Sequence, residues 1–262
     1  MEINFPERPC REWEKGKEFI CLDETLPDIL QPQDFTSLSD SSYKGKIFVY
    51  DGLVEASPWR QGTVDLLFTC EGKTYYFNTG KSRKEIEITS YTPLLPSLVS
   101  CEEIDKARSL LVGKTLYTRP ATWVDSLGNT SANHRYCPVK IIDVRPGNNI
   151  YPIAFVFKDE NSSTYSILGS LMQTSHLQAA TFDRLFTFDN PRRYYKNISD
   201  KHWQLITHCR VTEGMTKDEC RLSLGSPMRV REIPTYSGLK EEWFYRTGAY
   251  LYFEDGKLTH FR

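Results

Sequence analysis

Cys101 is the residue of this chain best placed to act as a nucleophile. It stands at the start of a predicted helix, whose dipole would lower the pKa of the thiol and make it more reactive. A cysteine nucleophile also needs a histidine base within hydrogen-bond reach. Nothing in the sequence brings one of the 5 histidines near Cys101. The sequence therefore predicts no catalytic cysteine.

Metal binding requires cysteine and histidine side chains at paired spacing. The nearest approaches to such spacing are His134-x-x-Cys137, and His208-Cys209 together with Cys220. Neither supplies two matched pairs of ligands. We therefore predict buried or half-buried thiols and ordinary histidines, and no metal site.

The acidic residues and glycines of the chain do not form a known catalytic motif either. Glu102-Glu103 and Glu241-Glu242 are adjacent pairs, and neighbours on a strand point to opposite faces. The chain contains no GxSxG elbow, phosphate-binding glycine loop or HExxH helix. These observations predict a protein that is not an enzyme and has no cofactor. An enzyme whose site is assembled across domains stays open as an alternative.

The elements that precede residue 190 are predicted to be mainly β-structure, in two modules covering residues 1–96 and 97–190. The β-rich runs of the two modules lie at 47–50, 64–68 and 74–77, and at 115–117, 153–157 and 164–167. Short strands separated by turn residues are typical of SH3-like barrels or small sandwiches. The second module opens with a helix predicted over 101–111, with Ser100 at its cap. A helical stretch containing Phe182, Leu185 and Phe186 is predicted near its end.

Residues 199–262 are predicted to form two short helices followed by an antiparallel sheet of three or four strands. Ser199 is placed to cap the first helix. Thr216 and Glu219 have capping-box spacing at the start of the second helix. Gly225 suits the residue just past a helix end, and the proline at position 227 prevents the helix from continuing. The whole chain is therefore expected to be a multi-domain α+β protein.

Strand alternation predicts two faces for this C-terminal sheet. Tyr250 and Tyr252 share one face, and Leu251 and Phe253 share the other. Asp255-Gly256 follows this run and predicts a tight hairpin. One face is expected to pack on the two helices, and the tyrosine face is expected to be open.

A family resemblance appears in the same region. Its elements are a Gly214-Met215-Thr216 helix start, a Leu224-Gly225-Ser226-Pro227 stop, a Trp243-x-Tyr245 strand and the run Leu251-x-Phe253-x-Asp255-Gly256-x-Leu258. This order resembles the SmpA/OmlA (BamE-like) domain of bacterial envelope lipoproteins, whose small fold is similar to that of β-lactamase inhibitor proteins. The resemblance covers residues 199–262 only. It implies protein binding at the cell envelope and supplies no active group.

Two binding functions follow as hypotheses. The first is a non-enzymatic adaptor or assembly protein that binds a protein partner through Trp243, Tyr245, Tyr250 and Tyr252. The alternative is a glycan or cell-wall binding protein that uses Trp59 and Trp123, because aromatics make up 13% of the chain and both tryptophans lie in predicted loops. A tryptophan in a loop also often plugs a core, which weakens the second hypothesis.

Charge and hydropathy disfavour two other partners. The formal net charge of −1 is not the basic excess that nucleic-acid binders usually have. No apolar run approaches the roughly 20 residues of a membrane-spanning helix. The segment from Met1 to Trp13 lacks the hydrophobic region of an export signal. The compartment stays open, because unpaired cysteine spacing favours the cytoplasm and the resemblance implies the envelope.

Overall fold

The computed structural model describes residues 8–25, 30–32, 42–56, 62–119, 122–132, 134–148, 150–171, 180–235 and 238–262. This part of the chain is mostly β-structure with few helices, as the sequence predicts. The chain divides into two compact units. One unit comprises Met1–Lys114, Ile141–Val156 and Ile167–Arg184, and the other comprises Thr115–Lys140, Phe157–Ser166 and Leu185–Arg262. The three-domain division drawn from the sequence stays a prediction.

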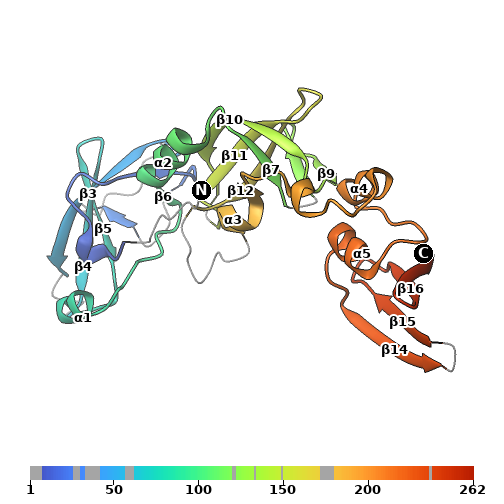
Figure 1. Ribbon diagram of the computed structural model, residues 1–262. Coiled ribbons are helices and arrows are strands. Elements are labelled where there is room, and N and C mark those ends of the chain that lie inside the picture. Colours follow the sequence, from blue (N-terminus) through green and yellow to red (C-terminus); the bar gives the residue numbers. More distant parts are fainter. Residues whose placement is uncertain are drawn as a thin grey trace. The chain divides into compact units, whose positions relative to one another are not determined.

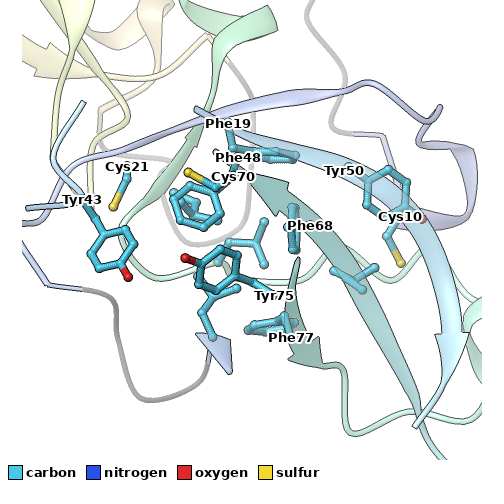
Figure 2. Close-up of a cluster of buried hydrophobic side chains, with 14 of the residues drawn as sticks. Cys10, Phe19, Cys21, Tyr43, Phe48, Tyr50, Phe68, Cys70, Tyr75 and Phe77 are labelled. Carbon is cyan, nitrogen blue, oxygen red and sulfur yellow. The ribbon is translucent and has the colours of Figure 1, made fainter. Parts of the chain in front are cut away.

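The first sheet has six strands in the order β2-β5-β4-β3-β1-β6. Its strands are β1 (Glu18–Cys21), β2 (Leu30–Pro32), β3 (Ile47–Glu55), β4 (Val64–Cys70), β5 (Lys73–Asn78) and β6 (Leu98–Ser100). Figure 2 shows the aromatic side chains that these strands direct into one core. Phe19 meets Phe68 edge-on at 5.7 Å between ring centroids, and Phe48 meets Tyr75 at 5.2 Å. The 64–68 and 74–77 strands predicted from the sequence are confirmed as parts of β4 and β5.

The second sheet has seven strands in the order β13-β7-β10-β11-β12-β8-β9. They are β7 (Thr115–Thr118), β8 (Thr122–Asp125), β9 (Thr130–Ala132), β10 (Pro138–Pro146), β11 (Ile153–Lys158), β12 (Thr164–Gly169) and β13 (Phe186–Thr187). The sequence indicated β7, β11 and β12, but not β10. The predicted helical stretch near position 182 is shorter than expected, because Phe186 pairs with Thr118 as the first residue of β13.

Helices lie before, within and between the sheets along the described chain. They are the 3-10 helices η1 (Cys10–Glu12) and η4 (Pro191–Tyr194), and the α-helices α1 (Arg83–Ile88), α2 (Cys101–Leu111), α3 (Phe182–Leu185), α4 (Asp200–Thr207) and α5 (Lys217–Leu224). The prediction of a helix over 101–111 is confirmed, although Ser100 makes no capping hydrogen bond with its side chain. The cap at Ser199 is confirmed, because its hydroxyl accepts a hydrogen bond from the His202 amide at 3.1 Å.

The C-terminal sheet has four antiparallel strands in the order β14-β15-β16-β17. They are β14 (Arg229–Thr235), β15 (Gly238–Phe244), β16 (Tyr250–Glu254) and β17 (Lys257–Phe261). The predicted hairpin between β16 and β17 is confirmed, with Asp255 at φ 47° and Gly256 at φ 80°. Positive φ at both central residues is what a tight two-residue hairpin turn requires, and glycine adopts it without strain.

Helix α5 begins where the sequence predicts, with a complete capping box. The Thr216 hydroxyl accepts from the Glu219 amide, and the Glu219 carboxylate accepts from the Thr216 amide. The residues just before this cap are also bonded to β17. The Gly214 amide donates to the Leu258 carbonyl, and the Leu258 amide donates to the Met215 carbonyl, both at 2.8 Å. The start of α5 is therefore anchored to the last strand of the sheet.

Of the helices in the described part of the chain, none has the length and apolar composition needed to cross a bilayer.

Candidate functional site

The C-terminal sheet has an inner face that packs against α4 and α5. Its central side chains are Trp243, Leu251 and Phe253, each 1% exposed or less. They form one core with Ile206 of α4 and Cys220 of α5. The predicted alternation is confirmed, because Leu251 and Phe253 are buried while the tyrosines between and before them are half-buried.

Trp243, a predicted partner-binding residue, lies on this inner face and is held from two sides. Its indole Nε1 donates to Glu241 Oε2 at 3.0 Å. The guanidinium of Arg221, from α5, lies 4.5 Å from the ring centroid, within the range of a cation–π contact. Lys217, also from α5, pairs with Glu241. Trp243 therefore joins the sheet to α5 and has no surface free for a partner.

Glu241 is 5% exposed, yet it stays ionised at neutral pH. Burial alone would raise the pKa of its carboxyl, but the hydrogen bonds from Lys217 and Trp243 outweigh burial, and the pKa lies below its ordinary value of 4.5. Tyr245, the second predicted binding residue, is also buried, with 8% of its surface exposed. Its hydroxyl donates to the Gly225 carbonyl at 3.2 Å and fixes the end of α5.

The opposite side of the sheet, which we call the outer face, presents a different set of side chains. Strand alternation and register assign to it Arg229, Arg231, Ile233, Lys240, Glu242, Phe244, Tyr250, Tyr252, Glu254, Lys257, His260 and Arg262. The other two predicted binding residues, Tyr250 and Tyr252, lie here and are half-buried. The structure thus separates the four predicted residues into two pairs on opposite faces.

One row of the outer face runs across all four strands, and we call it the arginine–aromatic row. Arg229 of β14 is opposite Phe244 of β15, and Phe244 is opposite Tyr250 of β16. Tyr250 and Arg262 exchange two backbone hydrogen bonds of 3.0 Å, which continues the row past the end of β17. The order across the sheet is therefore arginine, phenylalanine, tyrosine, arginine.

The side chains of this row contact one another. The Phe244 and Tyr250 rings are 5.3 Å apart between centroids. The guanidinium of Arg229 lies 5.9 Å from the Phe244 centroid, and that of Arg262 lies 5.6 Å from the Tyr250 centroid. Both arginines are exposed, whereas both rings are half-buried. The row thus consists of an apolar centre with a cation at each end.

The next row contains Arg231, Glu242, Tyr252 and His260. Its negative charge is already compensated. Glu242 lies 3.5 Å from the Arg231 guanidinium and accepts a hydrogen bond from the Tyr250 hydroxyl at 3.0 Å. Burial raises the pKa of Tyr250 above its ordinary value, and this hydrogen bond raises it further. The row therefore adds no free anion to the outer face.

The third row contains Ile233, Lys240, Glu254 and Lys257. In it Lys240 pairs with Glu254 at 3.0 Å. Arg229 and Arg262 differ from these groups. Among the residues that the structure describes, no carboxylate forms an ion pair with either guanidinium. No carboxylate of the described residues pairs with Lys257 either, so the unpaired cations of the outer face are Lys257 in the third row and the two arginines of the arginine–aromatic row.

The predicted glycan-binding tryptophans do not form a site in the described structure. Trp59 lies outside the described residues. The placement of Trp123 in an exposed loop was wrong, because it belongs to strand β8 and is 2% exposed. Its ring stacks on His134 at 4.0 Å and meets Phe157 edge-on at 5.2 Å. A sugar stacks on an open aromatic face, which an indole with 2% of its surface exposed does not offer.

The structure also changes the expected reactivity of Cys101. Cys101 does begin helix α2, but the expected lowering of its pKa was wrong. Burial raises the pKa of this thiol above its ordinary value of 9.0, and the carboxylates of Glu18 and Asp105 raise it further. All seven cysteines are free thiols. Within the described residues, no group of three or more histidine, cysteine or acidic side chains is arranged to hold a metal ion.

A pocket of about 520 Å³ lies between the 194–198 segment and α5. Its charged side chains are paired with one another or with near neighbours. Arg221 bonds Asp218 at 3.2 Å, and Glu219 lies 2.8 Å from His202 Nδ1. These pairs leave the pocket without the free charged groups that the outer face offers.

Comparison of the chain with family models, with curated proteins and with solved structures finds no match. The outer face therefore has to be judged on its own geometry.

The analysis of the sequence missed Arg229, Phe244 and Arg262, which complete the row around Tyr250. The available signal was the alternation of Arg229 and Arg231 in β14, which puts two cations on one face of a strand.

Proposed function

We propose that this chain is a non-enzymatic interaction protein, acting as an adaptor or in assembly, and that the outer face of its C-terminal sheet binds a protein partner. The arginine–aromatic row is the single observation that carries this proposal. Aromatic residues and arginine are the residue types enriched at protein interfaces and among their hot spots. Here three of them stand on paired strands and Arg262, just after β17, is bonded to Tyr250, so their backbone positions are fixed before a partner arrives.

The BamE-like resemblance of residues 199–262 supports the same class of function. The order of α4, α5 and a four-stranded antiparallel sheet is compatible with the helix-helix-sheet layout that the resemblance implies. In this proposal, residues 1–96 and 97–190 act as two β-rich modules, of SH3-like or small-sandwich type. They carry the C-terminal sheet as a binding element, at the bacterial envelope if the resemblance extends to location.

Site-specific photo-crosslinking in the native host tests the proposal with the full chain. A photoreactive phenylalanine analogue replaces Phe244 or Tyr252 on the outer face, and Tyr194 serves as the control because it is 72% exposed and belongs to η4. We expect one protein to be crosslinked from both outer-face positions and not from position 194. Equal crosslinking from all three positions, or no specific partner at micromolar concentration, would contradict the proposal.

A further inference from the structure

We infer that the partner segment bound by the outer face is an extended acidic peptide that crosses the four strands, with two carboxylates at positions i and i+4 and an apolar or aromatic side chain at i+2. The carboxylates bind Arg229 and Arg262, and the central side chain lies on Phe244 and Tyr250. This inference rests on the proposed function and specifies the chemistry of its partner.

Charge is the first step of the argument. The two carboxylates of the outer face, Glu242 and Glu254, are each paired with a cation of the same face. Arg229 and Arg262 are exposed and have no carboxylate partner within the part of the chain that the structure describes. The side chains that a ligand meets at the two ends of the arginine–aromatic row are therefore both cationic.

Spacing is the second step. Neighbouring strands lie about 4.8 Å apart, so the three intervals between β14 and β17 place the two arginine backbones about 14 Å apart. An extended peptide rises about 3.3 Å per residue, so its residues i and i+4 are about 13 Å apart. Residues i, i+2 and i+4 of such a peptide point to the same side. One peptide side thus matches the order cation, ring pair, cation.

The chemistry of arginine is the third step. A guanidinium that lies on a ring face keeps its N–H edge free, and that edge binds a carboxylate through two parallel hydrogen bonds. Arg229 and Arg262 lie over Phe244 and Tyr250 in this manner, with 5.9 and 5.6 Å to the ring centroids. The rings therefore restrict the guanidinium groups, which lowers the entropy lost when a carboxylate binds.

The same face is poorly suited to a nucleic-acid strand. A polyanionic backbone needs a run of unpaired cations, whereas Arg231 and Lys240 in the other rows are already paired with Glu242 and Glu254. The whole chain also has a formal net charge of −1, without the basic excess of nucleic-acid binders. A peptide that carries two separated carboxylates around an apolar residue needs cations only at the two ends of the arginine–aromatic row.

Peptide binding to the full chain tests the inference. The probe is a blocked, fluorescently labelled Gly-Glu-Ser-Phe-Ser-Glu-Gly peptide, measured by fluorescence anisotropy. We expect Arg229→Glu and Arg262→Glu each to weaken binding by about tenfold or more. The matched control Arg184→Glu, an exposed arginine of α3, should leave binding unchanged. Circular dichroism of each variant verifies that the chain is folded.

A charge swap makes the test stricter. The double variant Arg229→Glu, Arg262→Glu should bind a peptide in which both glutamates are replaced by lysine, and should bind it better than the wild-type chain does. Loss of both carboxylates, by replacement with glutamine, should abolish binding to the wild-type chain. Equal binding of the glutamine peptide, or tighter binding of a single-stranded oligonucleotide than of the acidic peptide, would overturn the inference.

The two proposals fail in different ways. If the partner crosslinked from Phe244 is still captured by the double glutamate variant, the acidic-peptide inference is wrong and the proposed function stands. If no partner is crosslinked from the outer face at all, the proposed function itself is wrong.

Discussion

Phe244 of β15 and Tyr250 of β16 are directly opposite residues on the outer face, with ring centroids 5.3 Å apart and planes inclined by 59°. Cross-strand aromatic pairs of this kind contribute about 0.5–1.5 kcal/mol beyond the area they bury. The pair therefore stabilises the hairpin that joins β15 and β16, and it also forms the apolar centre of the candidate binding row. Substitutions of the flanking arginines test binding without removing this pair.

Salt should weaken binding of the acidic peptide. The proposed contacts join exposed guanidinium and carboxylate groups, and the Debye length falls from about 10 Å at 0.1 M to about 3 Å at 1 M. We expect the dissociation constant to rise several-fold between about 0.05 M and about 0.5 M sodium chloride. An Arg229→Gln, Arg262→Gln variant should bind weakly and show little salt dependence. A salt-independent affinity of the wild-type chain would contradict an electrostatic mode.

Trp243→Ala should destabilise the C-terminal sheet by about 3–5 kcal/mol, the usual effect of removing a fully buried large aromatic side chain. The loss includes the hydrogen bond to Glu241 and the contact with Arg221. Native-state hydrogen exchange of β15 and β16 amides measures the change locally, which matters in a chain of several sheets. Tyr194→Ala, at an exposed site, should alter the same protection by less than about 0.5 kcal/mol.

Thr216→Ala should lower the stability of α5 by about 1 kcal/mol, because it removes the hydroxyl that accepts from the Glu219 amide at 3.2 Å. Thr216→Ser keeps an acceptor at the same place and should stay close to the wild-type value. Amide protection within α5 reports the difference. Equal protection in the alanine and serine variants would show that the cap does not contribute.

Acid should destabilise the C-terminal sheet and α5 through Glu241 and Glu219. Burial raises the pKa of both carboxyls, but hydrogen bonds outweigh it: from Lys217 and Trp243 to Glu241, and from Thr216 and His202 to Glu219. Both pKa values consequently lie below 4.5. A carboxyl with a lowered folded-state pKa contributes stability above its unfolded pKa and loses that contribution as the pH falls through the folded pKa. The free energy of unfolding should therefore be steady above about pH 5 and fall below about pH 4.5.

Urea unfolding between about pH 3 and pH 7 measures this dependence. Glu241→Gln should make the chain less stable at neutral pH and reduce the loss in acid, because glutamine does not titrate. Glu213→Gln, at an exposed position, is the matched control and should retain the wild-type pH profile. A wild-type profile that stays flat to pH 3 would show that neither buried glutamate is linked to folding.

Local signals in the sequence predicted the elements of the C-terminal region, because these elements depend on neighbouring residues. The alternation of Tyr250 and Tyr252 with Leu251 and Phe253 is a property of one strand. The Thr216–Glu219 capping box and the Asp255-Gly256 turn each involve only a few consecutive residues. Such features need no knowledge of which strands pair.

The arginine–aromatic row could not be predicted in this way, because it depends on the register of all four strands. Arg229 and Arg262 are distant in sequence, and they share a row only after three pairings are formed.

Trp123 is a similar case, because the residues around it, with a proline before it and Gly128 after it, favour a loop. Pairing of β8 with β9 and β12 instead places it in a core. The thiol of Cys101 was misjudged because burial, which the local sequence does not report, outweighs the helix dipole.

The hydrogen bonds between the start of α5 and β17 imply that α5 is stabilised only late in synthesis. A ribosome releases the chain from its amino-terminal end, so the residues of α5 emerge well before Leu258, whose main chain bonds Gly214 and Met215. An eight-residue helix is marginal in isolation. While the final strand is still inside the exit tunnel, α5 therefore lacks its anchor, and maturation of this region follows completion of the last hairpin.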